Sequence, residues 1–162
     1  MDLNYKDFGQ GDPLVILHGL FGMLDNWQTL GKKLAKDHMV YLVDQRNHGR
    51  SPHVDSISYP EMADDLKKFM ESHWMHHAAV LGHSMGGKTA MQLALQHPDM
   101  VEKLVVVDIA PVRYPGGHQA IFEALLALEV EKADDRAEIE AQLEQRISDW
   151  SIRQFLMKNL RK

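Results

Sequence analysis

The segment Val80–Thr89, V-L-G-H-S-M-G-G-K-T, places Ser84 between two glycines in the pattern Gly-x-Ser-x-Gly. In this pattern the serine occupies a sharp turn from a strand into a helix, which lifts its hydroxyl above the sheet edge. Gly82 and Gly86 are the small residues that such a crowded turn needs. A helix beginning at Met85 would aim backbone N–H groups and its positive dipole end at the site. An apolar strand before the pattern and a third glycine after it favour a nucleophile over an incidental serine.

A second segment, H-G-L-F-G at 18–22, directly follows the apolar run Leu14–Leu17. Acyl transfer needs hydrogen-bond donors for the oxyanion of the tetrahedral intermediate. A loop in this place supplies one backbone N–H, and the residue after the nucleophile supplies the other. We therefore expect the N–H groups of Leu20 and Met85 to form an oxyanion hole. Taken alone, the segment could equally be a glycine turn that ends a strand.

A substrate pocket should lie beside these groups. Its expected lining residues are His18, Phe21, His83 and Phe122. For Phe122 and the apolar residues near it, packing against other helices is at least as good an interpretation.

A third segment, D-Q-R-N-H-G-R-S at 44–51, follows the apolar run Met39–Val43. We interpret it mainly as structural, because Asp44 and Arg46 could pair and Asn47 suits a turn. A catalytic role for His48 is the less favoured alternative, since it precedes the serine in the chain.

The elements that position these segments follow a regular alternation. Short apolar runs, typical of strands buried on both faces, lie at 14–17, 39–43, 78–81 and 104–107. A first strand is expected at 3–8, and helices at 26–36, 60–74 and 85–96. This alternation indicates an α/β fold, with a mostly parallel sheet and helices on both of its faces.

The pattern changes after Pro111. A Pro/Gly loop at 112–117 leads into helical patterns at 121–128, 134–147 and 152–160, and no strand pattern returns. We expect two parts, an α/β core at 1–111 and an incomplete helical cap at 112–162.

Composition narrows the function classes. The 162 residues carry a net charge of -5 and no cysteine. The acidic balance gives no reason to expect nucleic acid or an anionic membrane as partner, and a disulfide or thiol nucleophile is excluded. No apolar run is long enough to span a bilayer, so we expect a soluble, cytoplasmic protein. His73, His76 and His77 fit a helix end better than a metal site, and we expect no metal.

The motifs H-G-L-F-G, D-Q-R-N-H-G-R-S, G-H-S-M-G-G-K-T and V-V-D-I-A-P together resemble the small bacterial esterase branch of the α/β-hydrolase superfamily. They are also similar to the mitochondrial abhydrolase relatives of that branch. The resemblance covers the whole chain. It implies a serine hydrolase that cleaves short-chain acyl esters or thioesters through an acyl-enzyme, without a cofactor.

The catalytic triad of this fold runs in the order Ser, Asp or Glu, His. His97 lies thirteen residues along a helix from Ser84, roughly 20 Å away, and cannot be the base. His118 is an improbable substitute in a loop. Asp108 ends the strand at 104–107 and is our candidate acid, although it could instead anchor the following turn. Since members of the branch are longer, we expect a truncated form that lacks the triad histidine and the C-terminal part of the fold.

Two other readings stay open. The same scaffold could carry C–C bond hydrolysis or perhydrolysis, because a fold does not determine its chemistry. The chain could also be a catalytically inactive homologue that only binds a ligand. In each case we expect a small-molecule partner, and the sequence does not define the oligomeric state.

Overall fold

The structure, a computed structural model, describes residues 1–160. The chain divides into two compact units, Met1–Pro111 and Val112–Lys162. The last two residues of the expected cap, 161 and 162, lie outside the described residues.

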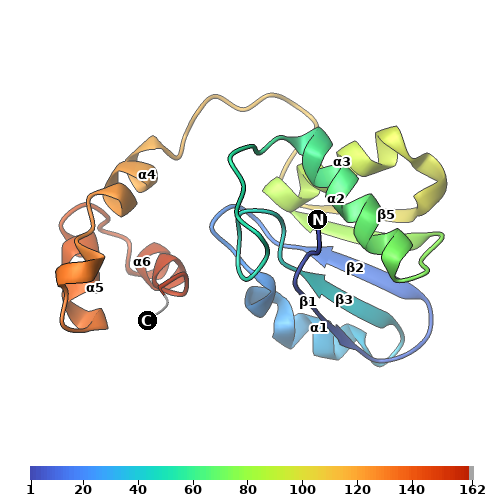
Figure 1. Cartoon of the computed structure of the whole chain (residues 1–162), viewed down its shortest axis with the longest axis horizontal. Coiled ribbons are helices and arrows are strands. Elements are labelled where there is room, and N and C mark those ends of the chain that lie inside the picture. The colour runs from blue at the N-terminus through green and yellow to red at the C-terminus, as the bar shows by residue number, and fades with distance from the viewer. Residues whose placement is uncertain (161–162) are drawn as a thin grey trace. The chain divides into compact units, whose positions relative to one another are not determined.

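The first unit is built on a five-stranded sheet with the order β1-β3-β2-β4-β5. Its strands are β1 (Tyr5–Phe8), β2 (Pro13–Leu17), β3 (Met39–Val43), β4 (Ala78–His83) and β5 (Val101–Val107). Only β1 runs antiparallel to its neighbour β3, and the other three pairings are parallel (Figure 1). The mostly parallel α/β sheet expected from the sequence is therefore confirmed.

Helices cover both faces of this sheet. On one face lie α2 (Tyr59–Ser72) and α3 (Met85–Gln96), and on the other lies α1 (Gln28–Leu34) (Figure 1). Short 3-10 helices at Leu24–Trp27 and Pro98–Met100 precede α1 and follow α3. The helix expected at 26–36 is thus a 3-10 turn followed by a shorter α-helix.

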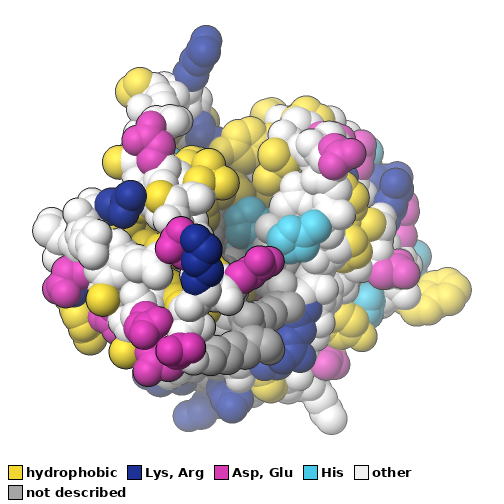
Figure 2. All heavy atoms as spheres, turned by 60° about the vertical axis from the view of Figure 1, so that its left-hand side comes forward, with side chains coloured by type: hydrophobic (Ala, Val, Ile, Leu, Met, Phe, Trp, Pro, Cys, Tyr) yellow, Lys and Arg dark blue, Asp and Glu magenta, His cyan; other side chains and the backbone are white. Residues whose placement is uncertain are grey.

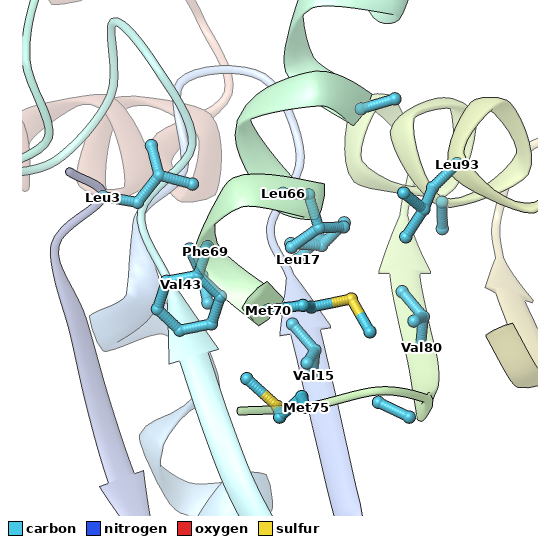
Figure 3. Close-up of a cluster of buried hydrophobic side chains, with 13 residues drawn as sticks. Leu3, Val15, Leu17, Val43, Leu66, Phe69, Met70, Met75, Val80 and Leu93 are labelled. Carbon is cyan, nitrogen blue, oxygen red and sulfur yellow. The ribbon is translucent and has the colours of Figure 1, made fainter. Parts of the chain in front are cut away.

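The core is divided between the two faces by the alternation of side chains along each strand. In β2, Val15 and Leu17 pack under α2 and α3, whereas Leu14 and Ile16 pack on the side of α1. Figure 3 shows the larger cluster, in which Met70 of α2 lies over Val15. Burying one such side chain stabilises the folded state by about 1.5–3 kcal/mol. Because both faces of β2 are covered by helices, successive residues of the strand must all be apolar to gain this stabilisation.

Strand β5 departs from the sequence prediction. The apolar residues 104–107 predicted a strand buried on both faces, but Leu104 is 41% and Val105 44% exposed. Within the described part of the chain, β5 pairs only with β4 and forms the edge of the sheet. The prediction was wrong because burial depends on what packs beside a strand, and within Met1–Pro111 no strand pairs with the outer side of β5.

Among its described residues the second unit consists of helices and connecting loops, without a strand. It contains α4 (Gln119–Leu126), α5 (Arg136–Glu144), α6 (Trp150–Met157) and a 3-10 turn at Val130–Lys132. Asp135 and Asp149 accept backbone N–H groups as N-caps of α5 and α6. Arg153 joins the two helices, since its guanidinium donates to Glu144 and to the carbonyl of Ile147.

The surface carries charges of both signs. On the face that Figure 2 shows, basic and acidic side chains are interspersed. No helix within residues 1–160 has the length and apolar character needed to cross a bilayer.

Candidate active site

The strand register brings the predicted motifs together at the end of the sheet where the parallel strands terminate. Leu17 of β2 pairs with Val43 of β3 and with Gly82 of β4, and His83 pairs with Val107 of β5. The segments that follow these strands therefore leave the sheet side by side. Ligand sites in open α/β sheets lie at this carboxyl edge, where the strands end.

Ser84 occupies a strained turn between β4 and α3. Its backbone has φ 50° and ψ -116°, a conformation that side chains rarely adopt. Two bonds hold the turn: the N–H of Ser84 donates to the carbonyl of Val107 at 3.0 Å, and the N–H of Lys88 donates to the carbonyl of Ser84 at 3.1 Å. The fold thus maintains an unfavourable backbone at the predicted nucleophile, as functional turns often require.

The glycines around Ser84 are needed for close backbone contacts. A Cβ on Gly82 would lie 2.2 Å from the carbonyl oxygen of Gly86, and one on Gly86 would lie 2.6 Å from the carbonyl oxygen of Leu17. No side chain fits at either position without a shift of the backbone. The Gly-x-Ser-x-Gly pattern is therefore a steric requirement of this turn.

The loop at 18–22 packs directly beside the nucleophile. A Cβ on Gly19 would lie 3.3 Å from the Cβ of Ser84. The carbonyl of Gly19 accepts the N–H of Gly22 at 3.0 Å and lies 2.8 Å from Nδ1 of His18. Because a trans peptide directs its N–H opposite to its C=O, the N–H of Leu20 is directed away from both contacts. Leu20 and Met85, the first residue of α3, remain the predicted oxyanion donors.

His18, the first residue of this loop, is directed into the interior and does not line a pocket. Its side chain is only 1% exposed, and Nε2 accepts the backbone N–H of Gln45 at 3.1 Å. Nδ1 therefore carries the proton and donates to the carbonyl of Gly19. Burial lowers the pKa of His18 to about 4, against an opposing effect of the Gly19 bond, and the nearby His48 lowers it further. His18 is a neutral, structural histidine, which corrects the expectation that it contacts substrate.

The other expected site residues have different settings. Asp108 follows β5 with φ 54°, and its carboxylate is 87% exposed. Its Oδ2 lies 3.9 Å from Nε2 of His83, whose ring is half-buried beside Trp27. Phe21 is partly buried at φ 58° in the loop after β2. The structure thus brings Ser84, His83 and Asp108 to one sheet edge, and Phe122 belongs to α4 of the second unit.

The segment at 44–51 is a packed scaffold. Asp44 accepts the N–H groups of Leu24 at 2.7 Å and Arg50 at 2.8 Å, and the amide of Asn4 at 2.7 Å. A Cβ on Gly49 would fall 2.1 Å from this carboxylate. Asp44 therefore joins three separate stretches of chain.

Arg46 does not pair with Asp44, contrary to the sequence expectation. Its Nε donates to Asp65 of α2 at 2.5 Å, and Nη1 lies 3.1 Å from Glu61. Because the carboxylate of Asp44 already accepts three N–H donors, the guanidinium of Arg46 pairs with Asp65 and Glu61 instead. His48 is buried, with Nδ1 2.9 Å from the carbonyl of Arg46, and burial lowers its pKa. A structural role for His48 agrees with this setting.

Sequence reasoning did not single out Gln45 or Asp65, both of which are buried. No spacing rule marks them, because their partners lie far away in sequence. Among residues 1–160 no three His, Asp or Glu side chains come together as a metal site. His73 instead packs against Phe69 with ring centroids 4.3 Å apart.

Residues 12–138 match the model of the family described as alpha/beta hydrolase fold. The chain belongs to the α/β-hydrolase family. Because the match covers most of the chain and includes all three motifs at the sheet edge, the membership expected from those motifs is confirmed.

Relatives of this α/β-hydrolase include named esterases and lipases. It is 41% identical over 148 residues to esterase YbfF of Escherichia coli, covering 91% of this chain and 58% of that protein. It is 44% identical over 155 residues to sn-1-specific diacylglycerol lipase ABHD11 of Mus musculus, covering 91% and 50%. The solved structure of a marine microorganism esterase superposes with a TM-score of 0.97 at 45% identity, covering 99% and 64%. The chain thus spans about half to two thirds of the length of these relatives.

Proposed function

We propose that this α/β-hydrolase is a serine esterase that cleaves short-chain acyl esters or thioesters through an acyl-enzyme at Ser84. The observation that carries the proposal is the strained backbone of Ser84 at the N-terminus of α3. The carbonyl of Val107 in β5 holds this backbone by accepting its N–H. A turn kept at φ 50° by its surroundings exposes a serine in the way that nucleophilic attack requires.

In this proposal Oγ of Ser84 attacks the acyl carbonyl, and the alcohol or thiol leaves as the acyl-enzyme forms. The N–H groups of Leu20 and Met85 stabilise the oxyanion. The position of Gly19 beside Ser84 supports this role for the loop. Water then hydrolyses the acyl-enzyme and restores the serine.

The base that removes the proton from Ser84 must be a histidine with a free ring nitrogen. His18 has both nitrogens engaged, and His97 caps the far end of α3. His83 lies near Asp108 but directly precedes Ser84, whereas the triad histidine of this fold follows the serine and the acid in the chain. We propose that the base is a histidine outside residues 1–162 and that Asp108 orients it. The exposed carboxylate of Asp108 at the same sheet edge supports this assignment.

The names of the relatives favour an acyl ester as substrate. One relative is named an esterase and another a diacylglycerol lipase, and both names describe cleavage of an ester bond. Assays with esters of different acyl length and with a thioester distinguish the remaining substrate choices. The cytoplasmic location expected from the sequence likewise remains a prediction.

Covalent labelling of the 162-residue chain tests the nucleophile. A fluorophosphonate should add one label per chain, seen in the intact mass and mapped to the peptide that contains Ser84. Ser84→Ala should abolish the label. Ser72→Ala is the matched control, because Ser72 is an exposed serine at the C-terminal end of α2 whose hydroxyl contacts the carbonyl of Phe69 and the ring of His73 and should not affect labelling. Labelling that persists in Ser84→Ala would remove the proposed nucleophile.

Turnover tests the base. With p-nitrophenyl acetate, butyrate and octanoate, we expect the 162-residue chain to release at most one equivalent of nitrophenol. Added imidazole should accelerate labelling, because it can accept the proton of Ser84 from solution. Sustained turnover without imidazole would place the base within the chain. Cleavage of a C–C substrate but of no ester would favour the rival chemistry, and binding without labelling would favour a ligand-binding homologue.

A further inference from the structure

Gln45 is a buried residue that the proposed reaction does not use. It follows β3, is only 3% exposed and holds His18 at two points. Its backbone N–H donates to Nε2 of the His18 ring at 3.1 Å, and its side-chain Nε2 donates to the His18 carbonyl at 2.7 Å. Both bonds cross from the strand end of β3 to that of β2.

The side chain of Gln45 is poorly suited to a purely structural role. Its Oε1 is buried and has no hydrogen-bond partner. Turning the amide over would bring Oε1 against the carbonyl of His18, and two acceptors would then face each other. The orientation is therefore determined by His18. A buried acceptor without a partner is destabilising, and an apolar side chain of equal length would avoid it.

The contacts of Gln45 lead to the oxyanion loop in two steps. The side-chain amide of Gln45 holds the carbonyl of His18 and therefore the plane of the peptide bond from His18 to Gly19. The backbone N–H of Gln45 donates to Nε2 of His18, so Nδ1 carries the proton and donates to the carbonyl of Gly19 at 2.8 Å. Gly22 donates to the same carbonyl at 3.0 Å. The orientation of the Gly19 carbonyl sets the plane of the peptide bond to Leu20 and therefore the direction of the Leu20 N–H.

We propose that Gln45 is a positioning residue that holds the loop at 18–22 so that the N–H of Leu20 is directed at the oxyanion formed at Ser84. The proposal rests on the proposed function, because it assumes that Leu20 is an oxyanion donor. It adds that the direction of this donor depends on an amide side chain from the neighbouring strand end. A misdirected donor slows the chemical step, whereas substrate binding is little affected.

Gln45→Met is the informative variant. It keeps the length of the side chain and the backbone N–H to His18, and it removes the amide donor together with the unpartnered Oε1. Ser51→Ala is the matched control, because Ser51 is buried in the same segment and its hydrogen bonds, to the carbonyl of Asp44 at 2.6 Å and from the N–H of Asn4 at 2.8 Å, do not involve His18. The maximal rate of Ser84 labelling by a fluorophosphonate and the half-saturating concentration are measured separately. We expect Gln45→Met to lower the maximal rate roughly tenfold and leave the half-saturating concentration unchanged, whereas Ser51→Ala changes neither.

Amide hydrogen exchange provides a readout that does not depend on the reaction. The N–H of Gly22, bonded to the Gly19 carbonyl, should exchange faster in Gln45→Met and at the parent rate in Ser51→Ala. Labelling of Gln45→Met at the parent rate would overturn the proposal, and so would equal slowing in both variants. If Ser84 is not labelled even in the parent chain, the proposed function fails. Unchanged exchange at Gly22 in Gln45→Met would then overturn the positioning role as well.

Discussion

A Cβ on Gly19 would stand 3.3 Å from the Cβ of Ser84, so the loop after β2 and the turn after β4 meet without a side chain between them. The same Cβ would lie 3.0 Å from Nδ1 of His83. Both distances are shorter than ordinary van der Waals contact, and glycine is what allows the loop to approach the serine so closely. The glycine therefore sets the distance between the two parts of the site.

Gly19→Ala should impair the reaction more than the fold. The added methyl must push the loop or the His83 ring away by a few tenths of an ångström, which displaces the N–H of Leu20 from the serine. We expect the rate of fluorophosphonate labelling to fall about tenfold, since a displaced oxyanion donor loses much of its effect. Gly116→Ala is the control, because a Cβ there meets nothing within 4 Å. A Gly19→Ala chain that labels at the parent rate would show that the close approach is not needed.

Ser84→Gly should be more stable than Ser84→Ala. At φ 50° and ψ -116° a Cβ is strained, and glycine relieves the strain, whereas alanine retains it. Strain of this kind is worth about 1–3 kcal/mol, partly offset by the greater flexibility of glycine in the unfolded chain. Urea unfolding of the two variants should therefore differ by about 1 kcal/mol in favour of glycine. Equal stabilities would mean that the turn is not strained.

Arg46→Met should destabilise the first unit strongly. It leaves the carboxylate of Asp65 buried, with the α-amino group of Met1 at 3.7 Å as a remaining cation. Removing one partner of a buried ion pair costs about 3 kcal/mol or more. The exposed pair of Lys67 and Glu71, 3.1 Å apart on α2, is the reference, and Lys67→Met should change the free energy of unfolding by less than about 1 kcal/mol. Equal effects of the two substitutions in urea unfolding would contradict the structural importance of the Arg46 pair.

The neutral His18 predicts a loss of stability in acid. In the unfolded chain His18 binds a proton as the pH falls below 6.5, whereas in the folded chain its pKa is about 4. Protonation therefore favours unfolding progressively between pH 6.5 and 4, by about 3 kcal/mol in total, and has no effect above that window. The groups that modify this pKa are His48, His83 and Asp44.

His18→Gln isolates this contribution from the other groups that titrate in acid. Unfolding free energies of parent and variant are compared at pH 7 and pH 4.5. We expect the parent to lose about 2–3 kcal/mol more than His18→Gln over this interval. If the two lose the same amount, His18 is not held neutral by its burial.

The sequence predicts most of the first unit because its signals are local. The strand Met39–Val43 and the helix Met85–Gln96 have the bounds that the sequence predicts. Each is a regular apolar pattern bounded by residues that end it, Asp44 for the strand and Pro98 after the helix. The turn at Ser84 could also be predicted from the sequence, since its glycines are required by contacts within a few residues.

What the sequence could not predict depends on neighbours that are distant in the chain. Arg46 had Asp44 two residues away, yet it pairs with Asp65, because the Asp44 carboxylate is occupied from three sides. His18 stands in a motif that predicts contact with substrate, and only the position of Gln45 shows that its ring is buried and engaged. Partner choice of this kind follows from tertiary packing, which residue type and spacing do not encode.

The bond from the N–H of Ser84 to the carbonyl of Val107 links the reactive turn to the last residue of the edge strand. Docking of β5 against β4 therefore supplies one of the bonds that hold the strained geometry of the serine. The reactivity of Ser84 therefore reports on folding, and the rate of Ser84 labelling should follow the docking of β5 during refolding. Any chain that ends before residue 107 should carry an unreactive serine.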